Sequence, residues 1–292
     1  MRESMSQPRV LITGAGGQVG TALRQQLESE NFECHFLDRK QLPLEQTLII
    51  QDILSMYQPD IIIHTAAYTA VDKAESEPQL ADAVNHLASE EIAQYCRLHG
   101  AKLLAISTDY VFDGQSRTPL TEEAEPAPLN VYGHSKWKGE QAIQKWAPDS
   151  IIIRTAWVYG EHGHNFVNTM QRLMRERETL SVVNDQIGSP TYAGDLARAI
   201  ITILKAEHWA PGIYHYANEG EVSWYDFAVA IRDQIGASCQ IQPVPTSEYP
   251  TPAKRPSYSL LDKSKIKRTF NVSVPFWLDS LTAMLHPNQA ER

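Results

Sequence analysis

The stretch RVLITGAGGQVGTALRQQL, residues 9–27, passes from a short apolar strand through a glycine-rich turn into a helix. Val19, Leu23 and Leu27 follow one another at intervals of four residues, which places them on one face of that helix. The run before the turn is continuously apolar, as in a strand that is buried on both faces. A strand–turn–helix unit of this kind predicts the start of a parallel α/β sheet.

Apolar runs and helical stretches go on alternating through the first half of the chain. The later strands are expected at residues 32–38, 60–67, 102–108 and 150–160, and the helices between them at residues 47–58, 78–100 and 131–146. Strands rich in Ile, Leu and Val, separated by helices, indicate a parallel sheet with helices on both faces. The predicted fold class is therefore α/β, with a Rossmann-type doubly wound parallel sheet.

The first turn carries Gly14, Gly17 and Gly20, in the spacing G-x-x-G-x-x-G. Glycine permits a tight turn, a close approach of backbone amides to a pyrophosphate, and close packing of helix on strand. The N-terminus of the following helix adds partial positive charge for the phosphates. A plain turn without a ligand is the alternative, but the position between a buried strand and a helix favours a dinucleotide site.

Asp38 ends the second expected strand, 18 residues after Gly20. An acid at this place accepts hydrogen bonds from a ribose 2′-hydroxyl and repels a 2′-phosphate. Arg39 and Lys40 follow at once and could instead bind that phosphate. Asp38 favours NAD(H) and the basic pair favours NADP(H), so the sequence predicts NADH or NADPH as the coenzyme.

The alternation breaks after about residue 160, where helices and proline-rich loops follow. The segment at residues 240–259 contains too many prolines for a central strand. We expect this half to cap the mouth of the sheet as a smaller C-terminal substrate-binding lobe. The predicted division is an NAD(P)-binding Rossmann domain at residues 8–160 and a mainly substrate-binding lobe at residues 161–292, with the chain crossing back to the sheet.

Composition narrows the class of protein. Cys34, Cys96 and Cys239 are scattered and odd in number, which predicts no disulfide framework, no zinc site and a reducing cytoplasm. The ten histidines show no metal-ligand spacing, and His162 and His164 are expected to flank a mobile loop. No apolar run approaches the roughly 18 residues of a membrane span. The net charge of −9 argues against a nucleic-acid surface.

The stretch VYGHSKWKGE, residues 131–140, places Tyr132 four residues before Lys136, on one face of the expected helix. A cation beside a phenol favours its ionised form, so we expect Lys136 to lower the pKa of Tyr132. Taken alone, the pair favours the plainer alternative, an exposed Tyr/Lys pair on a solvated face. The dinucleotide turn upstream favours a proton donor beside a nicotinamide.

YGHSK is similar to the Y-x-x-x-K motif of short-chain dehydrogenase/reductases, and the glycine turn resembles that of their extended branch. Five segments together resemble the dTDP-4-dehydrorhamnose reductase family: HTAAYTAVDKAESEP (64–78), STDYVFDG (107–114), YGHSKWKGE (132–140), RTAWVYG (154–160) and DQIGSPTYAGDLA (185–197). The resemblance implies reduction of the 4-keto group of dTDP-4-dehydro-L-rhamnose by NAD(P)H. The implied product, dTDP-L-rhamnose, is a precursor of bacterial surface polysaccharide.

The resemblance also implies roles for individual residues. Tyr132 would be the proton donor, Lys136 would tune it, and Thr108 would hold the carbonyl oxygen. The residues that would bind the coenzyme are Gly14, Gly17, Gln18, Val19, Asp38, Ala66, Ala67, Tyr68, Tyr132 and Lys136. The residues that would bind the substrate are Thr108, Asp109 and Trp157.

Arg255 joins the substrate-binding set for a different reason, because a guanidinium suits bidentate contacts to the substrate diphosphate. Plainer roles stand beside several of these assignments: a turn cap for Asp109, a core aromatic for Trp157 and an exposed loop arginine for Arg255. Ser107 is the alternative to Thr108 as the hydroxyl that completes the catalytic group.

The chain departs from the family pattern at two places. The segment QLPLEQ, residues 41–46, has no Asp where the family carries an acid near the adenine. Ala22 stands where some members carry a glutamate of a metal-bridged dimer. We therefore expect no metal bridge, and a homodimer only through other contacts.

Rival functions share much of this pattern. A nucleotide-sugar 4,6-dehydratase would need a glutamate beside Asp109, which STDYVFDG lacks. A 4-epimerase would turn over without consuming NADH, and another nucleotide-sugar 4-ketoreductase would carry the same motifs. A regulatory subunit of the methionine adenosyltransferase type is the non-catalytic alternative. The expected partner is a dTDP-sugar, with no nucleic acid and no membrane.

Overall fold

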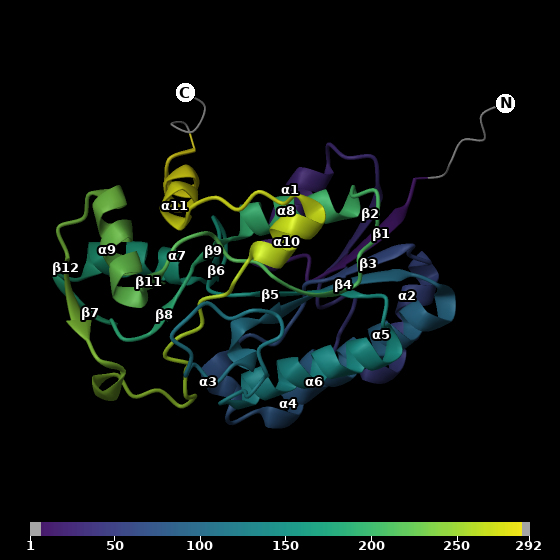
Figure 1. Ribbon diagram of the computed structural model, residues 1–292, viewed down its shortest axis with the longest axis horizontal. Helices are drawn as coiled ribbons and strands as arrows, with labels where there is room; N and C mark the ends of the chain where they lie inside the picture. Colours follow the sequence, from purple (N-terminus) through teal and green to yellow (C-terminus); the bar gives the residue numbers. More distant parts are fainter. Residues whose placement is uncertain (1–6, 288–292) are drawn as a thin grey trace.

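The computed structural model describes residues 7–287. At its centre is a six-stranded sheet in the order β10-β5-β4-β3-β1-β2, with every neighbouring pair parallel (Figure 1). Its strands are β1 (Arg9–Thr13), β2 (Glu33–Leu37), β3 (Ile61–His64), β4 (Lys102–Thr108), β5 (Ile151–Thr155) and β10 (Gly212–His215). The chain runs outward from β1 to β2 on one side and to β3 on the other, so the strand order reverses beside β1. Ligands of doubly wound sheets bind in the crevice at such a point.

Helices cover both faces of this sheet, as the sequence predicts (Figure 1). One face carries α1 (Gln18–Leu27), α8 (Ala193–Leu204) and α10 (Ser264–Phe270). The other carries α2 (Ile50–Tyr57), α5 (Ala88–His99) and α6 (Val131–Trp146), with the short helices α3 (Val71–Ala74) and α4 (Pro78–Asp82) and the 3-10 turn η1 (Thr47–Ile49) nearby. The predicted Rossmann-type α/β fold is confirmed.

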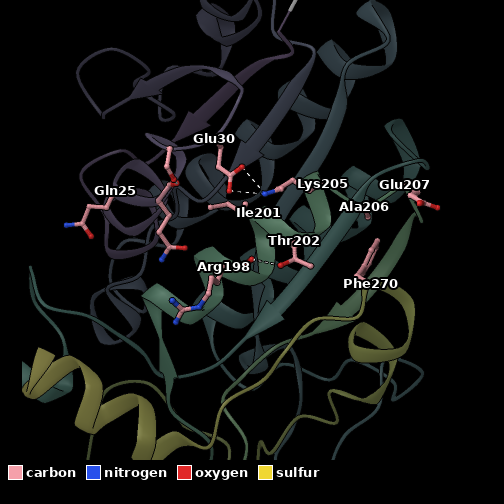
Figure 2. Close-up of a pocket in the computed structure, with 11 residues that line it drawn as sticks. Gln25, Glu30, Arg198, Ile201, Thr202, Lys205, Ala206, Glu207 and Phe270 are labelled. Atoms are coloured by element: carbon pink, nitrogen blue, oxygen red, sulfur yellow. Dashed lines mark hydrogen bonds and ion pairs between the residues drawn. The ribbon is translucent and has the colours of Figure 1, made fainter. Parts of the chain in front are cut away.

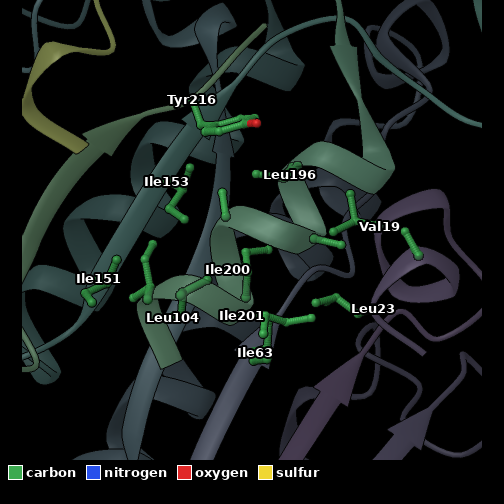
Figure 3. Close-up of a cluster of buried hydrophobic side chains, with 14 of the residues drawn as sticks. Val19, Leu23, Ile63, Leu104, Ile151, Ile153, Leu196, Ile200, Ile201 and Tyr216 are labelled. Carbon is green, nitrogen blue, oxygen red and sulfur yellow. The ribbon is translucent and has the colours of Figure 1, made fainter. Parts of the chain in front are cut away.

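The strand sequences explain these two faces. Successive residues of a strand point to opposite sides, so a continuous apolar run supplies both cores. Ile61 and Ile63 lie in the core under α1 and α8, whereas Ile62 lies in the core under α2, α5 and α6. Figure 3 shows the first of these cores, where Leu23 of α1 and Ile200 of α8 are fully buried with Ile63.

The helix expected at residues 78–100 is interrupted. A π-helical segment, η2 (Ala83–Leu87), lies between α4 and α5, and the helix ends at Gly100 in the left-handed conformation. Periodicity within the sequence does not reveal such an insertion, because one extra residue per turn barely changes the apolar pattern. π-bulges occur frequently at functional sites.

A second group of elements lies beside the sheet (Figure 1). It comprises α7 (Phe166–Glu176), α9 (Trp224–Ile235), α11 (Trp277–Leu285) and the paired strands β7 (Thr179–Val183) and β12 (Gln240–Val244), around a core of their own. The remaining short elements are β6 (Val158–Tyr159), β8 (Ile187–Gly188), β9 (Thr191–Tyr192), β11 (Val222–Ser223), η3 (Asp109–Val111) and η4 (Thr246–Glu248). Between these parts the chain returns to the main sheet through α8 and β10, so residues after 160 contribute to both. Nothing in residues 7–287 forms a helix of the length and hydropathy that a bilayer crossing requires.

Candidate active site

A cavity of about 890 Å³ opens at the carboxyl ends of β1, β3 and β4. Its lining includes residues from the glycine turn, the start of α6 and the loops after β2, β3 and β5. All the predicted coenzyme and catalytic residues line it, and so do three of the four predicted substrate residues: Gly14, Gly17, Gln18, Val19, Asp38, Ala66, Ala67, Tyr68, Thr108, Asp109, Tyr132, Lys136 and Trp157. Residues from six separate segments therefore meet at the point where the strand order reverses.

The glycine turn has the shape that a pyrophosphate requires. Gly14 has φ +73°, and a Cβ there would lie 2.8 Å from the backbone of Ala66. A Cβ on Gly20 would lie 2.2 Å from the carbonyl oxygen of Gly14. No side chain caps α1 at Gly17, so the first-turn amides of the helix remain available to a ligand at the cavity. These features fit the phosphates of a dinucleotide.

Tyr132 stands in the first turn of α6, which begins after Asn130. The Asn130 side chain caps the helix by accepting a hydrogen bond from the Gly133 amide at 2.8 Å. One turn later the Lys136 ammonium donates to the carbonyl oxygen of Ile106 at 2.8 Å. Both side chains are buried, with 8% of Tyr132 and 7% of Lys136 exposed. The exposed-pair alternative is therefore wrong.

The expected lowering of the tyrosine pKa is also wrong for this protein without coenzyme. Burial raises the pKa of Tyr132 to about 12, and the neighbouring Thr108 hydroxyl only partly offsets that rise. Burial likewise lowers the pKa of Lys136 to about 8, although Glu140 opposes this. Desolvation is the largest cause of both shifts, because burial removes water from the charged form of each group. Tyr132 is thus a protonated phenol at neutral pH.

Thr108 and Asp109 lie where β4 ends. The Thr108 hydroxyl accepts from the Tyr110 amide and donates to Asp109 Oδ1, both at 3.2 Å. Ser107 also lines the cavity, but its hydroxyl has no hydrogen-bond partner within residues 7–287. Of the two candidate hydroxyls, Thr108 is the one that acts on Tyr132, since it lowers the pKa of that phenol.

Asp109 is only 1% exposed, and burial raises its pKa to about 6. Because the folded pKa lies above the unfolded value of 3.8, its contribution to stability is complete at low pH and is lost as pH rises through 6. We compare the free energy of unfolding of Asp109→Asn with that of the wild type. The difference in favour of the variant should grow by about 2 to 3 kcal/mol between pH 3.5 and pH 7.5. Urea unfolding of both proteins at the two pH values checks this. A free-energy difference that does not change with pH would contradict it.

Two supporting residues were missed by sequence reasoning. Asn85, in the π-helical segment, accepts from the Tyr68 amide at 2.8 Å and donates to Ser135 of α6 at 2.9 Å. His64 is buried, its pKa is lowered to about 3 by desolvation, and it bonds Ser89 at 3.3 Å. Asn85 has no local sequence signal, because it acts through partners far along the chain. His64 begins the segment at residues 64–78 that resembles the family, but its partner Ser89 lies outside that segment. Together they hold the cavity wall to α5 and α6.

Trp157 lines the cavity and stacks on Trp224, with ring centroids 3.7 Å apart and planes 14° apart. Its backbone has φ +50°, a conformation that a bulky residue rarely adopts. Trp224, from the start of α9, brings the second group of elements to the cavity and was not predicted. His162 and His164 also line the cavity.

Arg255 does not reach the cavity lining. Its guanidinium donates to both carboxylate oxygens of Asp72, at 2.9 and 2.8 Å. A bidentate pair with a carboxylate uses the same fork that a diphosphate would need. Arg255 therefore joins the proline-rich loop to α3 in this structure, and its substrate role stays a prediction.

A second hollow, of about 800 Å³, lies over α1 and α8 (Figure 2). Lys205 and Glu30 bridge it through an ion pair of 2.9 Å. None of the predicted site residues lines it. Within residues 7–287 there is no cluster of three or more His, Cys, Asp or Glu side chains that could hold a metal ion.

The chain is similar to known proteins along nearly its whole length. The family profile described as RmlD substrate binding domain matches residues 8–290. The chain is 43% identical over 284 residues to dTDP-4-dehydrorhamnose reductase of Aggregatibacter actinomycetemcomitans, covering 94% of this chain and 97% of the relative. It is 37% identical over 276 residues to dTDP-4-keto-6-deoxy-D-glucose reductase of Streptomyces niveus, covering 94% and 96%. A solved dTDP-4-dehydrorhamnose reductase from Bacillus anthracis, in complex with NADP, matches with a TM-score of 0.91 and 40% identity, covering 95% of this chain and 98% of that one.

Proposed function

The chain belongs to the RmlD family of dTDP-4-dehydrorhamnose reductases, and from this membership we propose how its own residues carry out that reaction. The protein is an NAD(P)H-dependent oxidoreductase that reduces the 4-keto group of dTDP-4-dehydro-L-rhamnose to give dTDP-L-rhamnose. The observation that carries the proposed roles is the meeting of Tyr132, Thr108 and Lys136 in the same cavity as the glycine turn.

Binding of the coenzyme falls to the glycine turn and the loops beside it. Gly14, Gly17, Gln18 and Val19 would hold the pyrophosphate, and Asp38 would meet the adenosine ribose. Ala66, Ala67 and Tyr68 would line the groove between them. When bound, the reduced nicotinamide supplies the hydride that goes to C4 of the sugar.

Tyr132 supplies the proton. With its pKa at about 12 the phenol is fully protonated at neutral pH, so it can donate to the alkoxide that develops as the ketone is reduced. The Thr108 hydroxyl would hydrogen-bond the same oxygen and fix its orientation. Lys136, with a pKa of about 8, carries positive charge one helical turn away and would stabilise the tyrosinate that remains.

The sugar nucleotide would lie between this group and the stacked tryptophans. Asp109 would accept a hydrogen bond from a sugar hydroxyl, and Trp157 would lie against the nucleotide part. Trp224 supports that ring by stacking on its other face.

The test is loss of reduced-nicotinamide absorbance when purified protein is given NADH or NADPH and dTDP-4-dehydro-L-rhamnose. Steady oxidation in proportion to ketosugar is expected, and NMR of the product should show dTDP-L-rhamnose. Sugar turnover without coenzyme oxidation would favour an epimerase. No turnover, with co-purification of a methionine adenosyltransferase, would favour the regulatory subunit.

A second substrate has an observation in its favour. The Streptomyces niveus relative reduces, by its name, a 4-keto-6-deoxy-D-glucose nucleotide, and the chain matches it along nearly its whole length. Supplying that sugar in the same assay separates the two, because the wrong substrate should give a clearly lower kcat/KM. A higher value with the D-glucose derivative would replace dTDP-4-dehydro-L-rhamnose as the proposed substrate.

We further propose that the enzyme works in the cytoplasm, with no nucleic-acid partner. Ala22 supplies no carboxylate for a metal bridge, so a homodimer would form through other contacts. Sedimentation with and without EDTA tests this, and a dimer that dissociates in EDTA would contradict it.

A further inference from the structure

The loop after β2 contains an ion pair at the place where the coenzyme's adenosine ribose would lie. Arg39 donates to Glu45 Oε1 from Nη2 at 3.1 Å and from Nε at 3.4 Å. Both residues line the cavity, as do their neighbours Asp38 and Lys40. The sequence leaves open whether Arg39 would bind a 2′-phosphate. In this structure the Arg39 guanidinium is already paired with Glu45.

One carboxylate oxygen of Asp38 is also already hydrogen-bonded within the protein. Its Oδ1 accepts from the backbone amides of Lys40 at 2.8 Å and Gln41 at 3.0 Å. These bonds fix the turn that carries Arg39 and leave Oδ2 for a ribose hydroxyl. A 2′-phosphate placed there would meet two carboxylates, those of Asp38 and Glu45, before it could recruit Arg39.

The ion pair between Arg39 and Glu45 is exposed enough for a ligand to break it. The Arg39 side chain is 75% exposed and that of Glu45 is 30% exposed, so the pair is screened by water. The pKa of Glu45 is lowered, first by a backbone hydrogen bond and to a smaller extent by Arg39, which keeps the carboxylate charged at neutral pH. A phosphate must therefore compete with a permanent anion for a mobile guanidinium.

We propose that Glu45 sets the coenzyme preference of this enzyme by holding Arg39 away from the 2′-phosphate of NADPH. The inference rests on the proposed reductase function and names a residue that acts on the choice between its two coenzymes. The native protein should bind NADH more tightly than NADPH. Freeing Arg39 should improve NADPH binding alone, because NADH has no phosphate for the guanidinium to bind.

The experiment is fluorescence titration of NADH and NADPH into the full chain without sugar. Glu45→Gln is expected to lower the dissociation constant of NADPH about two- to fivefold, in line with releasing one exposed ion pair, and to leave that of NADH nearly unchanged. Glu176→Gln is the matched control. It takes a carboxylate from another exposed arginine, Arg172, at 2.9 Å on α7, and should change neither constant.

The double variant Arg39→Gln/Glu45→Gln tests the route of the effect. If Glu45 acts through Arg39, the gain for NADPH should disappear in the Arg39→Gln background. A gain of equal size in both backgrounds, or no gain in Glu45→Gln, would overturn the proposal. The titration measures coenzyme binding without sugar, so its result does not depend on the ketosugar assay. Failure of the coenzyme proposal can therefore be told apart from failure of the proposed reductase function.

Discussion

Replacing Tyr132 by Phe is expected to lower turnover of the ketosugar by about two to four orders of magnitude, the range for loss of a general acid. The substitution removes one oxygen and keeps the ring, which packs edge-on against Tyr110 with centroids 5.5 Å apart. Tyr132 and Thr108 are both buried and both line the cavity. The measurement is kcat with saturating NADH or NADPH.

The matched control for this prediction is Tyr159→Phe. Tyr159 is also a buried tyrosine, but it does not line the cavity, and its hydroxyl has no hydrogen-bond partner within residues 7–287. Its loss should leave turnover nearly unchanged. Coenzyme binding by Tyr132→Phe, followed by fluorescence, should stay within the same order as the wild type. Near-normal turnover of Tyr132→Phe would remove Tyr132 from the proposed mechanism.

The fold could be predicted because its signals are local. Runs such as residues 61–63 are apolar at every position, since the two faces of the sheet take alternate residues. The glycine turn and the helix caps also act over a few residues. The interruption by η2 could not be predicted, because a π-helical insertion depends on what packs against it and leaves the apolar pattern almost unchanged.

The residues of the site also differ in whether a local sequence signal reveals them. Gly14, Tyr132 and Lys136 stand in motifs that the sequence displays, and the structure brings them to one cavity. Asn85 and Trp224 have no such motif, because their importance comes from partners 50 or more residues away, Ser135 and Trp157. The predicted direction of the Tyr132 pKa shift was wrong for a related reason. Helical spacing reveals the neighbouring charge, but it says nothing of how deeply both groups are buried.

Thr108→Val should produce the second large loss, about two to three orders of magnitude in kcat, as for removal of one donor to a developing oxyanion. Valine keeps the shape of threonine, so what is lost is the hydroxyl that lowers the pKa of Tyr132 and would hold the substrate oxygen. Thr108→Ser keeps that hydroxyl and should retain most of the activity. This rescue separates a chemical role from the packing of the β4 end.

The comparison with Ser107 decides which hydroxyl serves the ketone. Both side chains are 5% exposed and line the cavity, but within residues 7–287 only the Thr108 hydroxyl has hydrogen-bond partners. Ser107→Ala should therefore cost much less turnover than Thr108→Val, measured at saturating coenzyme and sugar. If the large loss instead followed Ser107→Ala, the ketone would have to lie on the other side of the end of β4. Thr108 would then lose its proposed role of holding the substrate oxygen.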